Sequence, residues 1–326
     1  MSVQVLRPGL LMTLQDRGRH GHQHFGLCPG GAMDSVSYLL ANALVGNAAD
    51  EAVLEFTVLG PELVFPEQAL VALCGADFEA SIPLNRPVLL PAGSRLAIGR
   101  AVRGARGYLA VAGGFPVDVV LGSRSTYLPG AFGGLQGRTL RRGDVLPLAE
   151  EVAELSAERF AGLKKKNDRS VRWSAPPQTV PEREPVLLHA MEGQHHASFD
   201  SASQRAFFDT VWKVAPESNR MGFRLVGPPL ARPDADEILS GPTCLGTVQV
   251  PAGGVPIVLM ADHQTTGGYP KIAEIASADV PRLAQLAPGA TLHFARCNLE
   301  TANELRRHLR TRLESALRGI SWEYGK

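Results

Sequence analysis

Short hydrophobic runs recur about every ten residues between Ala52 and Leu148, and Gly, Pro or Asn separates them. No helical pattern of about ten residues lies between these runs, so their spacing favours a compact β sandwich or barrel over a parallel α/β sheet. Short strands are also expected at Val3–Leu6 and Leu11–Gln15. The other strands predicted in the first half are Leu63–Phe65, Leu70–Leu73, Val88–Leu90, Leu96–Ile98 and Tyr108–Val111.

Local signals predict helices as well. Asp34 is a good N-cap for a helix over Ser35–Val45, and Gly46 is placed to end it. Asp279 is expected to cap a short helix over Val280–Leu286. Near the end of the chain leucine recurs every four residues, which predicts an amphipathic helix with an arginine-rich outer face. Its leucines are Leu305, Leu309, Leu313 and Leu317, and its arginines are Arg306, Arg307, Arg310 and Arg312.

The second half repeats the mainly β pattern. Helices are expected at Ala149–Leu163 and Ser201–Thr210. Strands are expected at Val186–Ala190, Val211–Val214, Phe223–Val226, Gly246–Val250, Ile257–Ala261 and Thr291–Arg296. We therefore predict a mainly β fold with short helices (α+β). Its parts are an N-terminal β-rich half (1–155), a linker (156–185), a C-terminal half (186–300), and a C-terminal helix and tail (301–326).

Composition narrows the classes of function. The 326-residue chain is 44% hydrophobic and 20% charged, and its formal net charge of +1 gives no electrostatic case for a nucleic-acid partner. Its apolar runs are far shorter than the roughly 20 residues of a membrane span, and its first residues lack the pattern of a signal peptide. Four widely spaced cysteines without a Cys-x-x-Cys motif predict reduced thiols in a cytoplasmic protein.

One stretch, Met260–Ile275, carries a high density of polar groups between two apolar runs. The pattern predicts a strand, a tight exposed loop and a return strand. Glycines let backbone N–H groups approach a ligand, while polar side chains fix its orientation. An ornate hairpin loop without a ligand is the alternative. The groups in question are Asp262, His263, Gln264, Thr265, Thr266, Gly267, Gly268, Tyr269 and Lys271.

Several familiar motifs are absent from the sequence. It contains no Gly-x-x-x-x-Gly-Lys-[Ser/Thr] P-loop, no Gly-x-Ser-x-Gly elbow, and no Gly-x-Gly-x-x-Gly between a strand and a helix. His20, His22 and His24 would share one face if they formed a strand, as zinc ligands can. Flanking glycines and the lack of a completing carboxylate or thiolate favour a polar loop that lines a pocket, so we predict no metal site.

Three segments combine arginine or lysine with amide or carboxylate groups where a strand meets a loop. They are Gln15–Arg19 with Gly30–Asp34, Ser218–Arg224, and Met260–Ile275 with Gln249 before it. Such groups are suited to bind a small ligand that bears a carboxylate or an amide. The alternative is that Asp16, Arg19 and Arg220 form buried salt links that tie loops together.

Motifs in both halves are long, ordered and specific. Those of the first half are Leu14–Arg19, Gly31–Asp34, Ala41–Asn47, Leu54-Glu55, Tyr108–Gly114, Leu121–Thr126 and Gly143-Asp144. Those of the second half are Ser218–Leu225, Gly246–Pro251 and Asp262–Lys271. Together they resemble the family of biotin-dependent carboxyltransferase and allophanate hydrolase subunit 2-like proteins, from about residue 3 to 296. Leu27–Gly30 and Met191–His196 depart from the family pattern, which concerns substrate identity more than fold.

The resemblance implies two cyclophilin-like β-barrel halves, a site between them, and a B-type partner that resembles allophanate hydrolase subunit 1. The family includes the C-type subunit of bacterial ATP-dependent 5-oxoprolinase. With A-type and B-type subunits, that enzyme opens the lactam of 5-oxo-L-proline to L-glutamate. The resemblance therefore implies a hydrolase subunit that shares ATP with its partner subunits or leaves ATP to them. No nucleic acid or membrane is expected as a partner.

On this hypothesis the catalytic candidates are Asp16, Arg220, Asp262 and Lys271. The cations would meet carboxylate or phosphoryl oxygens, and the carboxylates would orient them or move a proton. The substrate-binding candidates are Gln15, Arg19, Asn219, Arg224, Gln249, Gln264, Thr265, Thr266, Gly267, Gly268 and Tyr269.

Two rival functions stay open. One is carboxyl transfer from carboxybiotin to a urea-like amide, as in urea carboxylase. Because the chain has no Met-Lys-Met tripeptide, biotin would then arrive on another protein. The other rival is a non-enzymatic subunit that binds a kinase-inhibitor protein.

Overall fold

Two compact units make up the chain. The computed structural model describes residues 1–149, 153–165, 169–233 and 238–324. One unit comprises Met1–Arg19, Gly30–Val180 and Arg312–Lys326, and the other comprises His20–Pro29 and Pro181–Thr311. We call them the N-terminal unit and the C-terminal unit.

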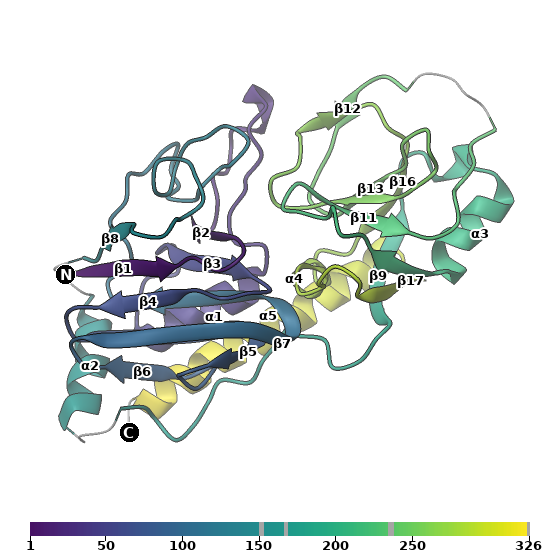
Figure 1. Ribbon diagram of the computed structural model, residues 1–326. Coiled ribbons are helices and arrows are strands. Elements are labelled where there is room, and N and C mark those ends of the chain that lie inside the picture. Colours follow the sequence, from purple (N-terminus) through teal and green to yellow (C-terminus); the bar gives the residue numbers. More distant parts are fainter. Residues whose placement is uncertain (150–152, 166–168, 234–237, 325–326) are drawn as a thin grey trace. The chain divides into compact units, whose positions relative to one another are not determined.

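An eight-stranded, mainly antiparallel sheet forms the N-terminal unit (Figure 1). Its main path runs β2-β3-β7-β4-β1-β8, and β5 pairs with β6 and β7. One face buries Leu14, Phe56, Leu73 and Leu109 in a continuous core. The strands are β1 (Ser2–Arg7), β2 (Met12–Gln15), β3 (Val53–Thr57), β4 (Glu62–Phe65), β5 (Ala69–Ala80), β6 (Pro87–Leu90), β7 (Ser94–Val111) and β8 (Val145–Pro147).

In this unit the predicted strands were too short. The separate strands expected at Leu96–Ile98 and Tyr108–Val111 are the two ends of the single 18-residue strand β7. The glycines inside β7 do not end the strand. They allow neighbouring side chains to pack closely against its backbone. At Gly107 a Cβ atom would lie 2.4 Å from the ring of Phe56, its partner on β3.

The first helix forms as the local signals predict. Helix α1 spans Ser35–Val45, and the Asp34 carboxylate accepts hydrogen bonds from the backbone N–H groups of Val36 and Ser37. Gly46 ends the helix in the left-handed conformation, with φ of 80°. Asp34 also accepts a hydrogen bond from the Thr179 hydroxyl, at 2.5 Å.

A closed seven-stranded barrel forms the C-terminal unit (Figure 1). Its strands, in order around the barrel, are β10 (Val211–Val214), β11 (Gly222–Val226), β14 (Ile257–Leu259), β13 (Thr247–Gln249), β16 (Lys271–Ile275), β9 (Val186–Glu192) and β17 (Thr291–Arg296). A separate two-stranded ribbon joins β12 (Gly241–Pro242) to β15 (Thr266–Gly267). The predicted mainly β fold with helices is confirmed.

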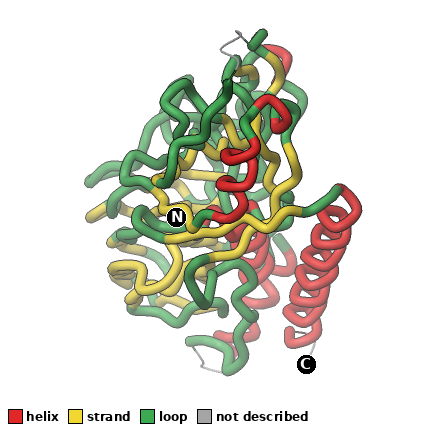
Figure 2. The backbone as a smooth tube through the Cα atoms, turned by 90° about the vertical axis from the view of Figure 1, so that its right-hand side faces the viewer, coloured by secondary structure: helices red, strands yellow, loops and turns green. Residues whose placement is uncertain are grey.

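The remaining helices are α2 (Glu154–Lys165), α3 (Ser201–Asp209), α4 (Val280–Ala284) and α5 (Leu299–Tyr324). The helix expected from Ala149 would begin among residues 150–152, which lie outside the described residues. Helix α5 runs without a break almost to the C-terminus (Figure 2). Its leucine stripe is half-buried and its arginines are exposed, as predicted. No helix in the described ranges is long and apolar enough to cross a membrane.

One local prediction was wrong. The Asp279 side chain does not cap α4, because its Oδ2 instead accepts a hydrogen bond from the backbone N–H of His189 at 2.7 Å. The Asp279 carboxylate therefore bonds a residue distant in sequence rather than the N–H groups of the adjacent helix. In the histidine-rich segment, the strand that would place His20, His22 and His24 on one face does not form: Gln23–Phe25 is a short 3-10 helix, η1, that begins after His22.

Candidate functional site

A β-bulge brings the key side chains of the C-terminal barrel onto one face. Thr247 and Gln249 are two residues apart on β13, so their side chains share a face. Their partners on β16 are Glu274 and Lys271, which are three residues apart. The bulge between them adds one residue to β16 and so restores the phase. Without it, Lys271 and Glu274 would point to opposite faces of the strand.

Gln249 and Lys271 supply hydrogen-bond donors at this position. Both are buried, with exposed fractions of 1% and 4%. The Lys271 Nζ atom donates to the Pro242 carbonyl at 2.6 Å. The Gln249 Oε1 atom accepts from Gln264 Nε2 at 3.1 Å, which orients the amide. Gln249 Nε2 has no hydrogen-bond partner in the described part of the chain. Buried donors of this kind are normally satisfied, so Gln249 Nε2 is a candidate ligand contact.

A pair of glycines faces these donors. Gly241 and Gly267 are partners across the ribbon of β12 and β15. A Cβ atom on Gly267 would lie 2.5 Å from Gln249 Nε2, and one on Gly241 would lie 3.5 Å from Lys271 Nζ. The two missing side chains keep the ribbon backbone close to both donor nitrogens.

Arg220 and Asp262 form a buried ion pair. Arg220 Nε lies 2.8 Å from Asp262 Oδ2, and Arg220 Nη2 lies 3.0 Å from Asp262 Oδ1. Their side chains are 3% and 2% exposed. The backbone N–H of Asp262 also donates to the Arg220 carbonyl, at 2.8 Å. For this pair the structure shows the buried salt link that the sequence left as an alternative, and the link fixes the start of the Asp262–Gly268 loop.

The loop itself differs from its prediction as tight and exposed. Asp262, His263 and Thr265 are buried, whereas Gln264, Thr266 and Tyr269 are exposed. Its flanking strands β14 and β16 do not form a hairpin, because each pairs with an opposite side of β13. Burial lowers the pKa of His263, so the ring is favoured in its neutral form. Gly268 follows Gly267 at the end of the loop.

Four side chains of this cluster were missed from the sequence. The Thr247 hydroxyl donates to Glu274 Oε2 at 2.8 Å, and Cys244 Sγ lies 3.4 Å from the same oxygen. Burial raises the pKa of Glu274 above its ordinary value of 4.5. His195 Nδ1 accepts from the Lys271 backbone N–H at 3.1 Å. Two of them carried a signal: Thr247 lies in the Gly246–Pro251 family motif, and His195 lies in a segment that departs from the family pattern.

Two other candidates of this unit, Asn219 and Arg224, are exposed. Asn219 is exposed, and its Oδ1 accepts from the Met221 backbone N–H at 2.8 Å, which stabilises a turn. Arg224 is also exposed, and it alternates on β11 with the buried Phe223 and Leu225. Its side chain therefore lies on the opposite face of the strand from theirs.

The N-terminal unit holds the remaining candidates, Gln15, Asp16 and Arg19. Asp16 Oδ1 accepts from the Ser123 and Ser125 hydroxyls at 2.6 and 2.5 Å, and Oδ2 accepts from the Arg124 backbone N–H at 2.5 Å. Gln15 Nε2 donates to the Thr126 carbonyl at 3.2 Å. Arg19 donates to the Ser125 carbonyl at 2.6 Å. These bonds anchor residues 123–126 to β2 and the loop after it.

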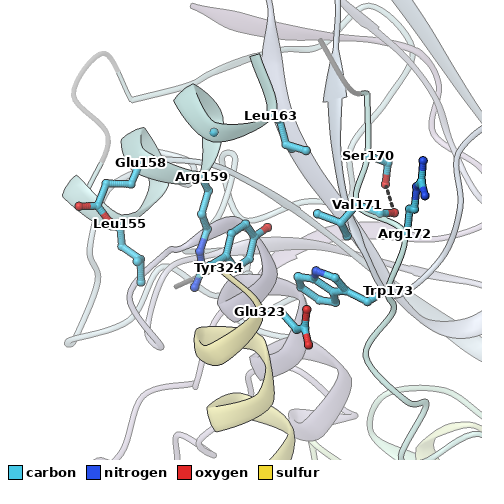
Figure 3. Close-up of a pocket in the computed structure, with 11 residues that line it drawn as sticks. Leu155, Glu158, Arg159, Leu163, Ser170, Val171, Arg172, Trp173, Glu323 and Tyr324 are labelled. Atoms are coloured by element: carbon cyan, nitrogen blue, oxygen red, sulfur yellow. Dashed lines mark hydrogen bonds between the residues drawn. The ribbon is translucent and has the colours of Figure 1, made fainter. Parts of the chain in front are cut away.

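A cavity of about 440 Å³ in the N-terminal unit was not predicted. It lies between α2, residues 170–173 and the end of α5 (Figure 3). The Arg159 guanidinium lies 4.2 Å from the ring centre of Tyr324, and Trp173 meets the same ring edge-on. Arg159 also donates to the Ala43 carbonyl. None of the predicted site residues lines this cavity.

No group of three or more His, Cys, Asp or Glu side chains in the described ranges is arranged to hold a metal ion. The cluster in the C-terminal barrel offers an amide donor, an ammonium group, the carboxyl groups of Asp262 and Glu274, and the imidazoles of His195 and His263.

Comparison with known proteins identifies a family whose model matches this chain. The model of the carboxyltransferase domain, subdomain A and B, matches residues 25–296. The C-type subunit of the 5-oxoprolinase of Escherichia coli is 39% identical over 309 residues, which cover 93% of this chain and 94% of that protein.

Relatives that act on urea are larger. The urea amidolyase of Lachancea kluyveri is 32% identical over 93% of this chain, but the match is only 17% of that protein. The crystal structure of the K. lactis urea amidolyase superposes with a TM-score of 0.86 and 30% identity, and it covers 97% of this chain and 20% of the other. The chain thus spans about a fifth of this solved structure and nearly the full length of the E. coli relative.

Proposed function

This chain belongs to the carboxyltransferase-domain family, and from this premise we propose that it is the C-type subunit of an ATP-dependent 5-oxoprolinase. In the proposed reaction the lactam of 5-oxo-L-proline is opened to L-glutamate together with A-type and B-type subunits. The observation that supports this choice is the share of each relative's length that this chain matches. The match to the C-type 5-oxoprolinase subunit of E. coli covers 94% of that protein, whereas the match to the L. kluyveri urea amidolyase covers 17%.

The chemistry of the barrel cluster suits this reaction. A lactam carbonyl is a poor electrophile, so the enzyme must stabilise negative charge on oxygen as the ring opens. Lys271 and Gln249 present N–H donors for oxygens of the substrate, and Gln264 orients Gln249. We assign Arg220 and Asp262 a positioning role, because their side chains bond each other and hold the loop that contains Gln264 and Thr265.

We propose that ATP is bound by the partner subunits. The sequence has no P-loop, and Gln249 and Lys271 offer donors for one small oxyanion rather than for a triphosphate. Phosphorylation of the lactam oxygen by ATP would create a leaving group. Asp16 stays a candidate for orienting donors at a second position, through residues 123–126.

The test is reconstitution with the A-type and B-type subunits. We expect ATP-dependent glutamate release from 5-oxo-L-proline, which is lost when this chain is omitted. Lys271→Ala should abolish release in an assembled complex, and Arg220→Ala should reduce it through the loop. Full turnover without this chain would refute the proposal.

The urea-carboxylase alternative rests on one specific observation, the TM-score of 0.86 with the K. lactis urea amidolyase. It predicts carboxylation of urea when a biotinylated partner is supplied, and no glutamate release from 5-oxo-L-proline. A third possibility, a non-enzymatic partner of a kinase-inhibitor protein, predicts neither activity. The same reconstituted complex therefore separates all three.

A further inference from the structure

The two hydrogen-bond donors of the barrel, Gln249 and Lys271, together carry one positive charge, which lies on Lys271. Gln249 and Lys271 are opposite one another on β13 and β16, and opposite residues of neighbouring strands have Cβ atoms about 5 Å apart. Both head groups offer N–H donors, and neither a primary amide nitrogen nor an ammonium group can accept a hydrogen bond. Whatever binds these two N–H donors must therefore present hydrogen-bond acceptor atoms.

The groups around Lys271 leave its positive charge largely uncompensated. The carboxylate of Asp262 is neutralised by Arg220. Glu274 is bonded to Thr247 and Cys244 instead, and burial raises its pKa. Burial and the charge of Lys271 lower the pKa of His195, which favours a neutral ring. Within the described ranges, no carboxylate lies within ion-pair distance of Lys271.

The glycine pair fits the same conclusion. Gly241 and Gly267 face Lys271 Nζ and Gln249 Nε2 from the ribbon, and a side chain at Gly267 would occupy the space next to the amide. Backbone without side chains beside a buried donor is the arrangement that a close-fitting small ligand needs. Gln249 is 1% exposed, so its unpartnered amide nitrogen is buried.

We propose that Gln249 Nε2 and Lys271 Nζ, facing the Gly241–Gly267 pair, together bind the carboxylate of the substrate, so that the site selects anionic amides over neutral ones. This inference rests on the proposed function and refines it. 5-Oxo-L-proline carries a carboxylate, whereas urea does not.

The test compares two ligands that differ only in the carboxylate, 5-oxo-L-proline and pyrrolidin-2-one. Their affinities for the full-length chain are measured by titration calorimetry without ATP. The wild type should bind 5-oxo-L-proline at least about tenfold more tightly, since a hydrogen-bonded charged group contributes roughly 1.5–3 kcal/mol and 1.4 kcal/mol is tenfold. Lys271→Gln should remove most of this preference and leave pyrrolidin-2-one binding within about twofold.

Lys213→Gln is the matched control, because Lys213 lies on the exposed face of β10 in the same barrel. It should leave both affinities unchanged. Equal binding of the two ligands by the wild type would overturn the inference, and that result does not depend on any variant folding. So would a Lys271→Gln chain that keeps the wild-type preference.

Failure of this inference and failure of the proposed function give different results. If the reconstituted complex releases glutamate but Lys271→Gln keeps the ligand preference, the function holds and the carboxylate lies elsewhere. If no glutamate is released but the preference depends on Lys271, the anion site holds and the assigned reaction is wrong.

Discussion

Gln249 and Lys271 lie opposite one another on β13 and β16 only because a β-bulge in β16 shifts Lys271 onto the face of Glu274. Gln249 Nε2 is buried and lacks a protein partner among the described residues, and Lys271 Nζ is held by the Pro242 carbonyl. Bulges re-aim side chains and are frequent beside active sites. This pair, rather than Arg220 and Asp262, is the part of the barrel that faces a ligand in our account.

Adding one methyl group at Gly267 tests the glycine pair. Its Cβ atom would lie 2.5 Å from Gln249 Nε2, so Gly267→Ala should displace the amide and lower kcat/KM of the reconstituted complex by roughly tenfold or more. Gly253→Ala is the control, because no atom lies within 4 Å of its Cβ position. Equal activity of the two variants would show that Gln249 needs no close approach of the ribbon.

The Arg220–Asp262 pair should behave as a structural unit. Removing Arg220 leaves Asp262 as a buried charge without its bidentate partner, so Arg220→Ala is expected to lower the free energy of unfolding by about 3–5 kcal/mol. The double variant with Asp262→Ala should lose less than the sum of the two single variants. Urea unfolding of the four chains measures this. Additive losses would mean that the two side chains are not energetically coupled.

The raised pKa of Glu274 should appear in the pH dependence of the free energy of unfolding. Burial raises its pKa in the folded chain above 4.5, so the folded state binds this proton more readily than the unfolded state. Its favourable contribution is complete below about pH 4.5 and is lost as the pH rises through the folded-state pKa. Glu274→Gln cannot ionise and keeps an acceptor for Thr247. Relative to the wild type it should therefore gain stability between about pH 4 and pH 7.

Thermal or urea unfolding at both pH values measures that difference. Lys213→Gln serves as a surface control that removes a charge without burial. A Glu274→Gln chain whose stability relative to the wild type does not change with pH would contradict the raised pKa of Glu274.

The contacts of Tyr324 beside the cavity of the N-terminal unit should stabilise the fold. Its hydroxyl donates to the Leu44 carbonyl at 2.9 Å, and its ring lies against Arg159 and Trp173. Tyr324→Phe should cost about 1 kcal/mol of unfolding free energy, and Tyr324→Ala should cost more because the ring contacts are lost as well. Urea unfolding measures both, and equal losses would show that the ring contributes nothing beyond its hydroxyl.

Elements set by nearby residues were predictable from the sequence. Helix α1 has its cap at Asp34 and its stop at Gly46, and both operate as expected. The leucine stripe of α5 and the strands of the barrel follow from periodicity in the same way. The Asp279 cap failed because its carboxylate bonds His189, which lies 90 residues away. No local signal announces such a partner.

The candidate site was predictable in part. The sequence identified Gln249, Gly267 and Lys271, because a dense polar loop after an apolar run is visible without a structure. It did not identify Gly241, since a two-residue strand has no periodicity and pairs with Gly267 only in the folded chain. It also missed Glu274, which shares a face with Lys271 only through the bulge, a feature that depends on pairing with β13.

The most direct measurement of the central claim is kcat/KM for 5-oxo-L-proline with Gln249→Glu in the reconstituted three-subunit complex. This change keeps the shape of the side chain but replaces the N–H donor with an acceptor that repels a carboxylate and pairs with Lys271. We predict a loss of about a hundredfold or more, with an assembled and folded complex. Turnover close to that of the wild type would contradict the account.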